Sequence, residues 1–441
     1  MSVPRALGWA AYRLGLSLAL PLSIPLLARR RGLRHYGTTL RGRLALGADP
    51  PVGPGPRLWI HAVSVGEVGV AATLIGALPE ELPLVVTTVT PTGQAEALRR
   101  FGGEHRIEVA YLPFDLAGPV RRFLERYRPA ALVLVEGDYW PLTLAEAQRR
   151  GIPVAVVNGR MSDRAFQRQR RIGPVNRLFY GPVQRFGVQS DEDRRRLVDL
   201  GVPADRVEVT GNLKFDSAEP PPKPELESLV RALAAGRPVV VAGSTMAGEE
   251  EQVLDAFQKL GGGAKALLIL APRHPGRFEG VAGLLAGRGV RWRRRSGAGQ
   301  EGEGALDVLL LDTLGELASL YRLASAAFVG GTLVPTGGHN PLEPARFAVP
   351  TVVGPSMHNF RGMAARFTER GAWRQVADAD ELATVVGEWL DDPGAAREIG
   401  ARGAALVADE RGASGRTARM LTPILEATRA ALRESGPTQT G

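Results

Sequence analysis

The chain has 441 residues, and a length this far beyond the size of one hydrophobic core predicts two globular domains. Hydrophobic residues make up 44% and charged residues 23% of the sequence, as in an ordinary well-packed protein. The absence of cysteine excludes disulfides, thiolate metal sites and cysteine nucleophiles. The formal net charge of +9 suits a nucleic acid, an anionic lipid or a phosphorylated substrate, and charge alone does not choose among them.

Residues 1–45 are expected to form a membrane anchor with a basic juxtamembrane segment. An uncharged run from Leu14 to Ala28 is followed at once by three arginines. The run is shorter than the roughly 20 apolar residues of a transmembrane helix, and no small-residue cleavage site separates it from the arginines. We interpret it as an uncleaved anchor in one leaflet, with Arg34, Arg41 and Arg43 against anionic head groups and the remaining chain in the cytoplasm. The alternative is a buried helix docked on the first domain.

Residues 46–216 are expected to form a first α/β domain, because apolar runs of strand length alternate there with amphipathic segments of helix length. Most of the runs are apolar on both faces, as in a parallel sheet that helices cover on both sides. The expected strands are Leu58–Val63, Leu84–Val89, Ile107–Leu112, Ala131–Val135, Val154–Val157, Phe186–Gln189 and Val207–Thr210.

Residues 217–441 are assigned to a second domain of the same kind, which begins with a proline-rich linker at 217–224. Its expected strands are Val239–Ala242, Ala266–Leu270, Val308–Leu311, Ala326–Val329 and Thr351–Val353. The segment Arg293–Gly304, rich in arginine, glycine and serine, is expected to be a surface loop. Both sheets should bind ligands beyond the carboxyl ends of their strands.

Three strand-end segments of the first domain carry candidate chemistry. Ser64 and Glu67 have the spacing of a capping box, so Glu67 is either a helix cap or a general base held by that cap. Glu136 and Asp138 follow the fourth strand, and solvated turn acids are the alternative there. Lys214 precedes the linker, where a lysine is otherwise a surface charge.

The second domain offers two candidate phosphate-binding segments. Arg273 follows the second strand, directly after Pro272, and a guanidinium there suits a phosphate. A glycine-rich loop from 330 then leads into a predicted helix start, with Asn340 as N-cap, Pro341 at N1 and Glu343 at N3. Such a start can bind an anion, and the alternative is a helix cap on a flexible loop.

Several motifs are absent. The sequence contains no G-x-G-x-x-G dinucleotide fingerprint and no G-x-x-x-x-G-K-[ST] phosphate loop, which argues against an NAD enzyme and an ordinary NTPase. Four of the six histidines fall in or near strand-end loops, but no dense ligand spacing such as H-E-x-x-H occurs, so a zinc site is not expected.

Taken together, these segments resemble the Kdo transferase family, a group of GT-B glycosyltransferases with two doubly wound domains facing a cleft. The similar stretches occur in the family's order across both halves. They are His61–Glu67, Val135–Pro141, Asn158–Ser162, Gly211–Asp216, Gly243–Thr245, Pro272–Pro275, Asp312–Leu317 and Gly337–Pro344.

The resemblance implies inverting transfer of Kdo, an acidic octulosonic sugar, from CMP-Kdo to a lipid A precursor (lipid IVA) in lipopolysaccharide biosynthesis, at the cytoplasmic face of the inner membrane. It implies that Glu67 is the general base, that Glu136 and Lys214 stabilise the transition state, and that no cofactor or metal is needed. The residues implied to hold CMP are Pro272, Arg273, Leu314, Gly315, Glu316, Asn340, Pro341, Leu342 and Glu343. An inverting displacement needs a base opposite the leaving group, and a guanidinium and a helix start suit the departing phosphate.

One departure from the family pattern concerns acceptor preference and the number of sugars added. Asp138 stands where the family usually has glutamate, and Gly137 replaces the usual threonine. The rival functions are a GT-B enzyme with a UDP-sugar donor, a membrane-bound nucleic-acid-binding protein suggested by Arg168–Arg171 and Arg291–Arg295, and a non-catalytic scaffold.

Overall fold

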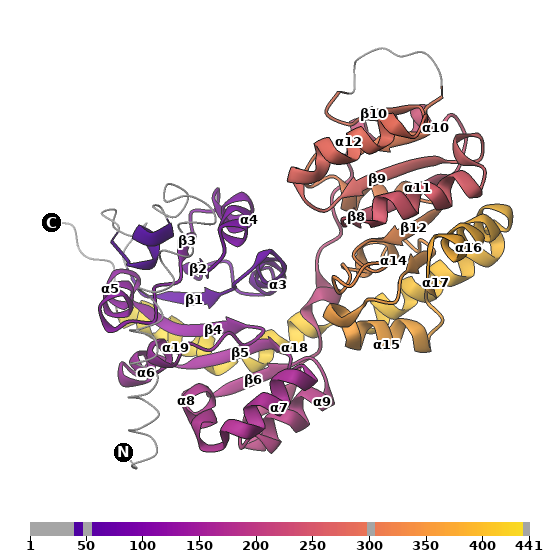
Figure 1. Cartoon of the computed structure of the whole chain (residues 1–441). Coiled ribbons are helices and arrows are strands. Elements are labelled where there is room, and N and C mark those ends of the chain that lie inside the picture. The colour runs from indigo at the N-terminus through magenta and orange to yellow at the C-terminus, as the bar shows by residue number, and fades with distance from the viewer. Residues whose placement is uncertain (1–38, 47–54, 298–304, 435–441) are drawn as a thin grey trace. The chain divides into compact units, whose positions relative to one another are not determined.

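The structure, a computed structural model, describes residues 39–46, 55–297 and 305–434. The chain divides into two compact units, residues 1–217 with 411–441, and residues 218–410 (Figure 1). The predicted anchor lies outside the described residues except for 39–45. Within the described ranges, no helix is long and apolar enough to cross a membrane.

The first unit is built on a parallel sheet of seven strands in the order β3-β2-β1-β4-β5-β6-β7. The strands are β1 (Arg57–His61), β2 (Leu84–Thr88), β3 (Ile107–Tyr111), β4 (Pro129–Val135), β5 (Val154–Gly159), β6 (Arg185–Val188) and β7 (Val207–Val209). All seven strands predicted for this half are therefore present.

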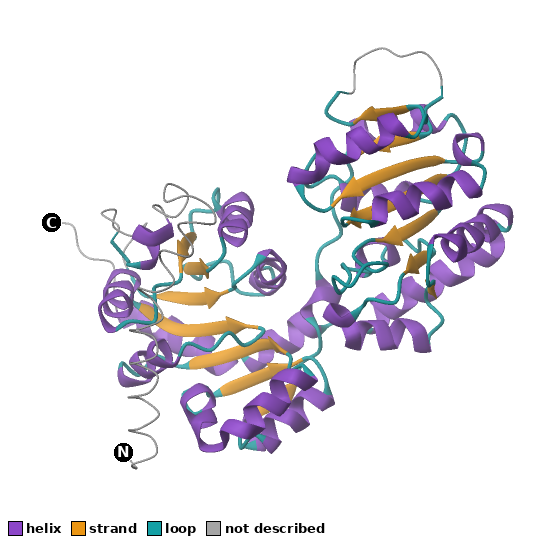
Figure 2. Cartoon of the chain, viewed as in Figure 1, coloured by secondary structure: helices purple, strands orange, loops and turns teal. Residues whose placement is uncertain are grey.

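Helices cover both faces of this sheet (Figure 2). They are α3 (Val65–Ile75), α4 (Pro91–Phe101), α5 (Ala117–Tyr127), α6 (Pro141–Arg149), α7 (Asp163–Ile172), α8 (Asn176–Tyr180), α9 (Asp191–Asp199), α18 (Ala413–Met420) and α19 (Thr422–Glu434), with short 3-10 turns η1 (Gly173–Val175), η2 (Ala204–Arg206) and η3 (Leu213–Asp216). Side chains along β1 point alternately to the two faces of the sheet, and each face has its own hydrophobic core. Leu58 and Ile60 pack into one core and Trp59 into the other. The Trp59 ring lies 4.6 Å from that of Phe123 on α5.

The second unit repeats this architecture with a parallel sheet in the order β10-β11-β9-β8-β12-β13-β14. The strands are β8 (Val239–Thr245), β9 (Leu267–Pro272), β10 (Trp292–Arg294), β11 (Val308–Leu310), β12 (Ala326–Val329), β13 (Thr351–Val353) and β14 (Arg374–Gln375). The helices are α10 (Pro224–Ala234), α11 (Glu249–Lys259), α12 (Phe278–Gly287), α13 (Leu317–Leu320), α14 (Leu342–Ala345), α15 (Arg361–Glu369), α16 (Ala379–Asp391) and α17 (Pro393–Asp409), with 3-10 turns η4 (Gly262–Ala264), η5 (Pro275–Arg277), η6 (Tyr321–Leu323) and η7 (His358–Phe360).

Helix α16 illustrates how local sequence sets these elements. Asp378 caps it by accepting hydrogen bonds from the backbone N–H groups of the second and third helical residues. Leu382, Val385, Val386 and Trp389 recur at helical spacing and are buried in the core of the second unit. Cap and apolar face together fix where the helix begins and which side it buries.

The prediction of a loop from Arg293 was wrong at its start, because Trp292–Arg294 forms the edge strand β10, paired in parallel with β11. An edge strand has one unpaired side and two half-exposed faces, so it tolerates arginines and lacks the apolar run of an inner strand. Strand β14 has only two residues, both exposed, and was not predicted for the same reason. Residues 298–304 of the predicted loop lie outside the described residues.

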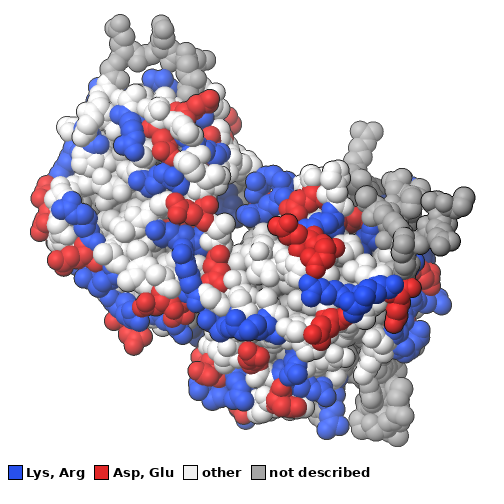
Figure 3. Space-filling view, turned by 180° about the vertical axis from the view of Figure 1, so that it is seen from behind, with Lys and Arg blue, Asp and Glu red and all other residues white. Residues whose placement is uncertain are grey.

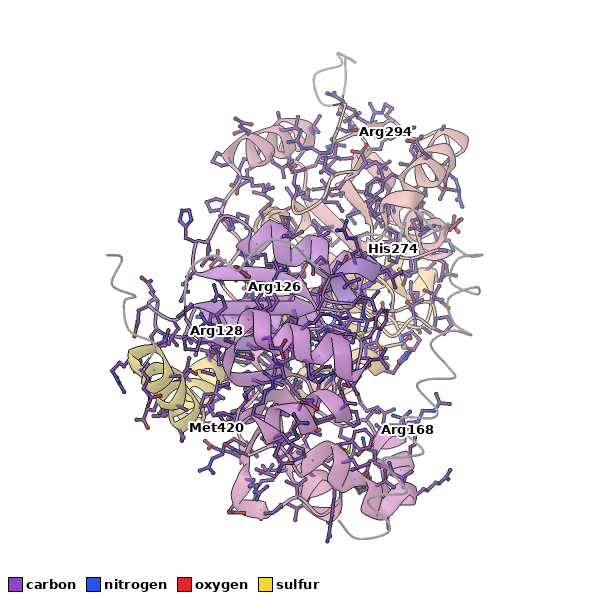
Figure 4. All side chains as sticks on the ribbon, turned by 90° about the vertical axis from the view of Figure 1, so that its left-hand side faces the viewer. Arg126, Arg128, Arg168, His274, Arg294 and Met420 are labelled. Carbon is purple, nitrogen blue, oxygen red and sulfur yellow. The ribbon has the colours of Figure 1, made fainter. Side chains whose placement is uncertain are left out.

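The assignment of all residues after 217 to the second domain was also wrong, because the chain returns to the first unit at Arg411. Helices α18 and α19 bury Ala413, Met420, Leu421, Ile424 and Leu425 in a core cluster of the first unit. Met420, labelled in Figure 4, lies close to Gly187 of β6, where an added Cβ would approach its sulfur to 3.0 Å. No proline-rich linker marks this second crossing, so composition gave no signal for it.

Asp216 fastens the returning segment to the first unit. Its carboxylate accepts hydrogen bonds from the backbone N–H groups of Gly412 and Ser414, at 2.8 and 2.6 Å, and from the Ser414 hydroxyl. Arg416 on α18 donates to the backbone oxygen of Thr210 at 2.9 Å. The turn η3, which contains Lys214, is thus held between β7 and the start of α18.

Each sheet has a position near its centre from which the strand order runs in opposite directions. In the first unit this switch lies between β1 and β4, and in the second between β8 and β12. The connections from these strands leave toward opposite sides, which opens a crevice beyond their carboxyl ends where open α/β sheets bind ligands. The segments that end these four strands are therefore the place to look for a functional site.

Candidate active site in two halves

Glu67 stands at the reversal point of the first sheet, as the third residue of α3. Its Oε2 accepts a hydrogen bond from the backbone N–H of Val63 at 2.5 Å. The predicted capping box is only partly formed, because Ser64 is the N-cap but its side chain makes no cap hydrogen bond. Glu67 reaches one residue further back than the box requires, so its carboxylate closes the β1–α3 loop and does not pair with Ser64.

The pKa of Glu67 is raised from 4.5 to about 7, first by desolvation and then by the negative charges of Glu136 and Asp138. The hydrogen bond from Val63 and the positive charge of Lys214 act in the opposite direction and are outweighed. A carboxylate that titrates near neutral pH suits proton transfer, because it can accept a proton and give it up again.

Glu136 follows β4 and forms an ion pair with Lys214, whose Nζ lies 2.8 Å from its Oε1. Asn158 Nδ2 also donates to that oxygen at 3.2 Å, and Arg160 Nε donates to the other at 3.2 Å. Desolvation alone would raise the pKa of Glu136, but the charges and hydrogen bonds of Lys214 and Arg160 lower it on balance. Glu136 is thus kept ionised, while the neighbouring Glu67 has a pKa near neutral pH.

The backbone at Glu136 is also unusual. Its φ of 59° and that of Asn158, 54°, lie in the left-handed region, which non-glycine residues seldom adopt. Gly137 follows with a φ of 95°, where a threonine would be strained. These two neighbouring strand ends meet at the Asn158–Glu136 hydrogen bond, and such strain concentrates at functional sites.

Asp138 belongs to a separate network beside Glu136. Trp140 Nε1 donates to its Oδ2 at 2.8 Å, and His61 Nε2 lies 3.4 Å from the same oxygen. The His61 ring is fully buried, and its Nδ1 lies 2.9 Å from Thr87 Oγ1. Burial alone would raise the pKa of Asp138, but His61, Trp140 and the charge of Arg43 lower it on balance. Asp138 is therefore an ionised, firmly oriented acid.

The structure places Arg43 on the first unit, where its guanidinium contacts the protein, and the expected contact with lipid head groups stays a prediction. Its guanidinium stacks on the Phe114 ring at 4.3 Å and donates to the Leu112 backbone oxygen at 3.3 Å. Its charge also acts on Asp138. The short helical turn that carries Arg43 therefore brings the basic segment up against the acid cluster. Arg41 is exposed.

Sequence reasoning proposed Glu67, Glu136 and Lys214, and the structure gathers all three at one switch point. It missed Asn158 and Arg160 as direct partners of Glu136, and Arg43 and His61 as neighbours of Asp138. The signal for Asn158 and Arg160 was their place at the end of the strand next to β4. No comparable sequence signal existed for Arg43.

In the second unit, Pro272 ends β9 and Arg273 follows it. The Arg273 backbone N–H donates to the Thr245 oxygen at the end of β8, at 2.9 Å, which ties the two strand ends together. Its half-buried side chain acts electrostatically on His339 and Glu343. The structure thus brings Arg273 and the glycine-rich segment to the same edge of the second sheet.

The predicted helix start at Asn340 was wrong in its details. Helix α14 is one turn long, Leu342–Ala345, with Pro341 as its N-cap, although Asn340 Oδ1 still accepts from the Leu342 N–H at 3.2 Å. So short a helix aligns few peptide dipoles, which weakens its attraction for an anion. Pro344 is the third residue of this helix, a first-turn position that tolerates proline.

Two titratable groups of this segment have shifted pKa values. Burial lowers the pKa of His339 to about 4, and the positive charges of Arg273 and His274 act in the same direction, so the imidazole is neutral. Burial raises the pKa of Glu343, while Arg346, Arg273 and a hydrogen bond from Asn340 oppose the rise. Arg273 therefore contributes positive charge beside a neutral His339.

The turn Leu314–Glu316 precedes α13, which packs beside the end of β8. Glu316 is held by Arg295 at 3.3 Å and by the Thr313 hydroxyl, so its carboxylate has a fixed position. Leu314 is 70% exposed, more than any other large apolar residue of the described chain. Gly315 has a φ of 77° and open space around it. The turn thus presents an apolar side chain and free space to a ligand.

Two arginine runs suggested binding to nucleic acid. In the run of the second unit, three of the arginines form ion pairs. Arg294, labelled in Figure 4, forms a two-point pair with Glu279, Arg291 pairs with Asp307, and Arg295 with Glu316. Arg168 on α7 is exposed. On the face seen in Figure 3, basic and acidic side chains are interspersed, unlike the continuous basic surface that tracks a nucleic-acid backbone.

Comparison with known proteins agrees with this site. A family model described as 3-Deoxy-D-manno-octulosonic-acid transferase (kdotransferase) matches residues 37–217. A 3-deoxy-D-manno-octulosonic acid transferase of Bordetella pertussis is 36% identical over 384 residues, 84% of this chain and 88% of that protein. The protein of that name from Haemophilus influenzae is 32% identical over 398 residues, covering 89% and 92%.

The fold also has counterparts among solved structures. A UDP-GlcNAc 2-epimerase from Neisseria meningitidis, crystallised with UDP-GlcNAc, matches with a TM-score of 0.56 at 14% identity, over 83% of this chain and 100% of that chain. A likeness at this identity concerns the fold, which is GT-B-like with two parallel seven-stranded sheets.

Proposed function

Since the chain belongs to the family of 3-deoxy-D-manno-octulosonic acid (Kdo) transferases, we propose that it moves Kdo from CMP-Kdo to a lipid A precursor, lipid IVA, with inversion at the anomeric carbon. The observation that carries the proposal is Glu67, a carboxylate with a pKa of about 7 at the switch point of the first sheet. Such a group can take a proton from an acceptor hydroxyl as that oxygen attacks the sugar.

In the proposed reaction, the acceptor oxygen forms a bond to the anomeric carbon while the bond from that carbon to the CMP phosphate breaks. The hydroxyl proton goes to Glu67, and the electron pair of the broken bond leaves with CMP. Glu136, kept ionised by Lys214 and Arg160, is suited to stabilise the positive charge that develops on the sugar ring. Lys214 holds Glu136 in place and offers a positive charge to the acidic sugar.

We propose that the second unit binds the cytidine nucleotide. The charge of Arg273 beside a neutral His339 suits one phosphate group, and the fixed Glu316 with exposed Leu314 suits the nucleoside. The roles proposed for Pro272, Asn340, Pro341, Leu342 and Glu343 come from family resemblance.

We also propose that the protein works at the cytoplasmic face of the inner membrane, with residues 1–38 as the anchor. The acceptor is a lipid, and the segment 39–46 ends against the first unit beside Asp138, through Arg43. An anchor attached there would bring the acid cluster close to lipid-borne hydroxyls.

The test is to incubate the purified protein with CMP-Kdo and lipid IVA and to read the product mass. We expect a mass increase of one or more Kdo units and release of CMP, and no product when UDP-sugars replace CMP-Kdo. A version lacking residues 1–38 should transfer Kdo to detergent-dispersed acceptor but perform poorly on vesicles. Absence of any Kdo adduct from the full-length protein would contradict the proposed reaction.

A further inference from the structure

Two adjacent glutamates open α11 and are completely buried, Glu249 and Glu250. Neither belongs to the nucleotide-contacting residues named above. Burial of two neighbouring carboxylates is costly unless each is fully hydrogen-bonded. They lie next to each other at the helix N-terminus, where the dipole favours negative charge, and successive helical side chains diverge, so each can reach a different segment.

Glu249 fastens the glycine-rich loop after β12. Its Oε1 accepts from the N–H groups of Thr332 and Leu333 at 2.8 and 2.9 Å, and its Oε2 from Gly331 and Met246 at 2.6 and 2.8 Å. A carboxylate has about four acceptor positions, so these four donors saturate it. Three consecutive loop amides therefore turn inward to one side chain, where they would otherwise form a nest open to an anion.

The loop cannot easily shift from this position. An added Cβ on Gly330 would lie 2.4 Å from the backbone oxygen of Ser244, so the two strand ends touch there. Further along, the Gly338 N–H donates to the Gly331 oxygen at 2.7 Å, one residue before His339. The segment that carries His339 and Asn340 is thus built outward from the residues that Glu249 holds.

Glu250 fastens the other nucleotide-binding segment. Its two oxygens accept from Arg277, at 2.5 and 3.0 Å, and Thr245 Oγ1 donates to the first of them at 2.9 Å. The Thr245 backbone oxygen in turn accepts from the Arg273 N–H. Arg273 therefore begins a turn whose last residue, Arg277, is locked by Glu250.

We infer that Glu249 and Glu250 are a pair of positioning residues for nucleotide binding, each holding one of the two segments that grip the donor phosphate. The inference rests on the proposed function, since it assumes that these segments bind CMP. Its distinctive consequence is separability. Neutralising one glutamate should loosen its own loop and leave the other loop in place, because the two carboxylates share no hydrogen-bond partner.

The test compares full-length Glu249→Gln and Glu250→Gln by amide hydrogen exchange and by calorimetry with CMP. In Glu249→Gln, the new NH2 group faces backbone donors, so amides 331–333 should exchange faster while the Arg273 amide stays protected. Glu250→Gln should show the reverse pattern. Each variant should weaken CMP binding by roughly tenfold, the factor of about one lost charge-assisted hydrogen bond.

The matched control is Val253→Ala, which makes a cavity in the core under the same helix and leaves the hydrogen-bonding atoms of both glutamates in place. It should lower the melting temperature as much as the glutamine variants while leaving CMP affinity within about twofold. If Val253→Ala weakens CMP equally, the glutamates act only through stability and the inference fails. Unchanged exchange at amides 331–333 in Glu249→Gln would also overturn it.

Two further results keep the inference separate from the proposed function. Wild-type protein that binds no CMP would contradict the function, while the exchange patterns would still test the two fastenings. Should Glu249→Gln not fold, exchange in the wild-type protein decides. Amides 331–333 should then exchange only when the whole second unit unfolds. Faster exchange by local unfolding would show that Glu249 does not hold this loop in place.

Discussion

The two switch points share one architecture but use their carboxylates in opposite ways. In the first unit, Glu67 accepts one backbone hydrogen bond and has a pKa of about 7, while Glu136 and Asp138 beside it have lowered values. In the second unit, Glu249 and Glu250 accept four and three hydrogen bonds and are sealed from solvent.

This difference shows what each half can contribute. A saturated carboxylate such as Glu249 has no acceptor position left for a substrate proton, so it can only hold structure. An acid that has unused acceptor positions and a pKa near the pH of the solution can take up a proton and release it again. Chemistry is therefore expected in the first unit and nucleotide affinity in the second, although both sheets place acids at the same topological position.

The largest expected effect comes from Glu67→Gln, which tests whether chemistry is confined to the first unit. The amide oxygen can still accept from the Val63 N–H, but an amide takes up no proton near neutral pH. General base catalysis typically supplies about 10²–10⁴-fold, so turnover measured by product mass should fall by at least the lower bound. CMP affinity should stay unchanged. A variant that melts normally and transfers at near wild-type rate would leave Glu67 as a cap, and Glu136 or Asp138 would be the next candidate base.

The next effect concerns affinity and uses Arg273→Ala in the second unit. Loss of a charge-assisted hydrogen bond to phosphate should weaken CMP binding in calorimetry by roughly 1.5–3 kcal/mol. Arg294→Ala is the matched control, because that arginine belongs to the same unit but pairs with Glu279. Equal CMP affinity in the Arg273 variant and the wild type would show that Arg273 does not bind the nucleotide. It would also contradict the assignment of nucleotide binding to this segment of the second unit.

The smallest effect is a pH dependence of stability that only the first unit should show. Because the pKa of Glu67 is raised from 4.5 to about 7, the folded state binds more protons than the unfolded state in this window. Its contribution to stability is therefore present below about pH 4.5 and is lost as the pH rises to about 7. Melting curves of Glu67→Gln should lack this component, whereas Glu249→Gln should retain it. Identical pH profiles in wild type and Glu67→Gln would show that Glu67 is not desolvated.

In wild-type protein, kcat/KM should rise with pH through about 7 as Glu67 loses its proton.

Sequence patterns were sufficient for features that are local. The inner strands appear as apolar runs. Glu136 and Arg273 follow such runs directly, and Glu67 lies in the first turn of the helix after another, so the rule that ligands bind beyond strand ends located them. The edge strand β10 escaped because its arginines lack an apolar run, and its backbone pairing with β11 leaves no trace in residue type.

Features that depend on distant partners could not be predicted in this way. Glu249 is separated from the amides of the glycine-rich loop by 82 to 84 positions, and the sequence shows only three acids at a helix start. Arg43 looks like one more juxtamembrane arginine until the fold places Phe114 beneath it. The pKa of Glu67 likewise follows from desolvation and from charges contributed by other strands.

The return of α18 and α19 to the first unit sets the order in which the protein can fold during synthesis. Leu421 and Ile424 belong to the core of that unit, yet they leave the ribosome after residues 218–410. Residues 218–410 form an uninterrupted unit and are complete before that point. We therefore expect the second unit to finish folding first, reversing the usual order from the N-terminus. Until α18 and α19 are synthesised, part of the apolar face of the first sheet is uncovered, and this face of the nascent chain needs protection from aggregation.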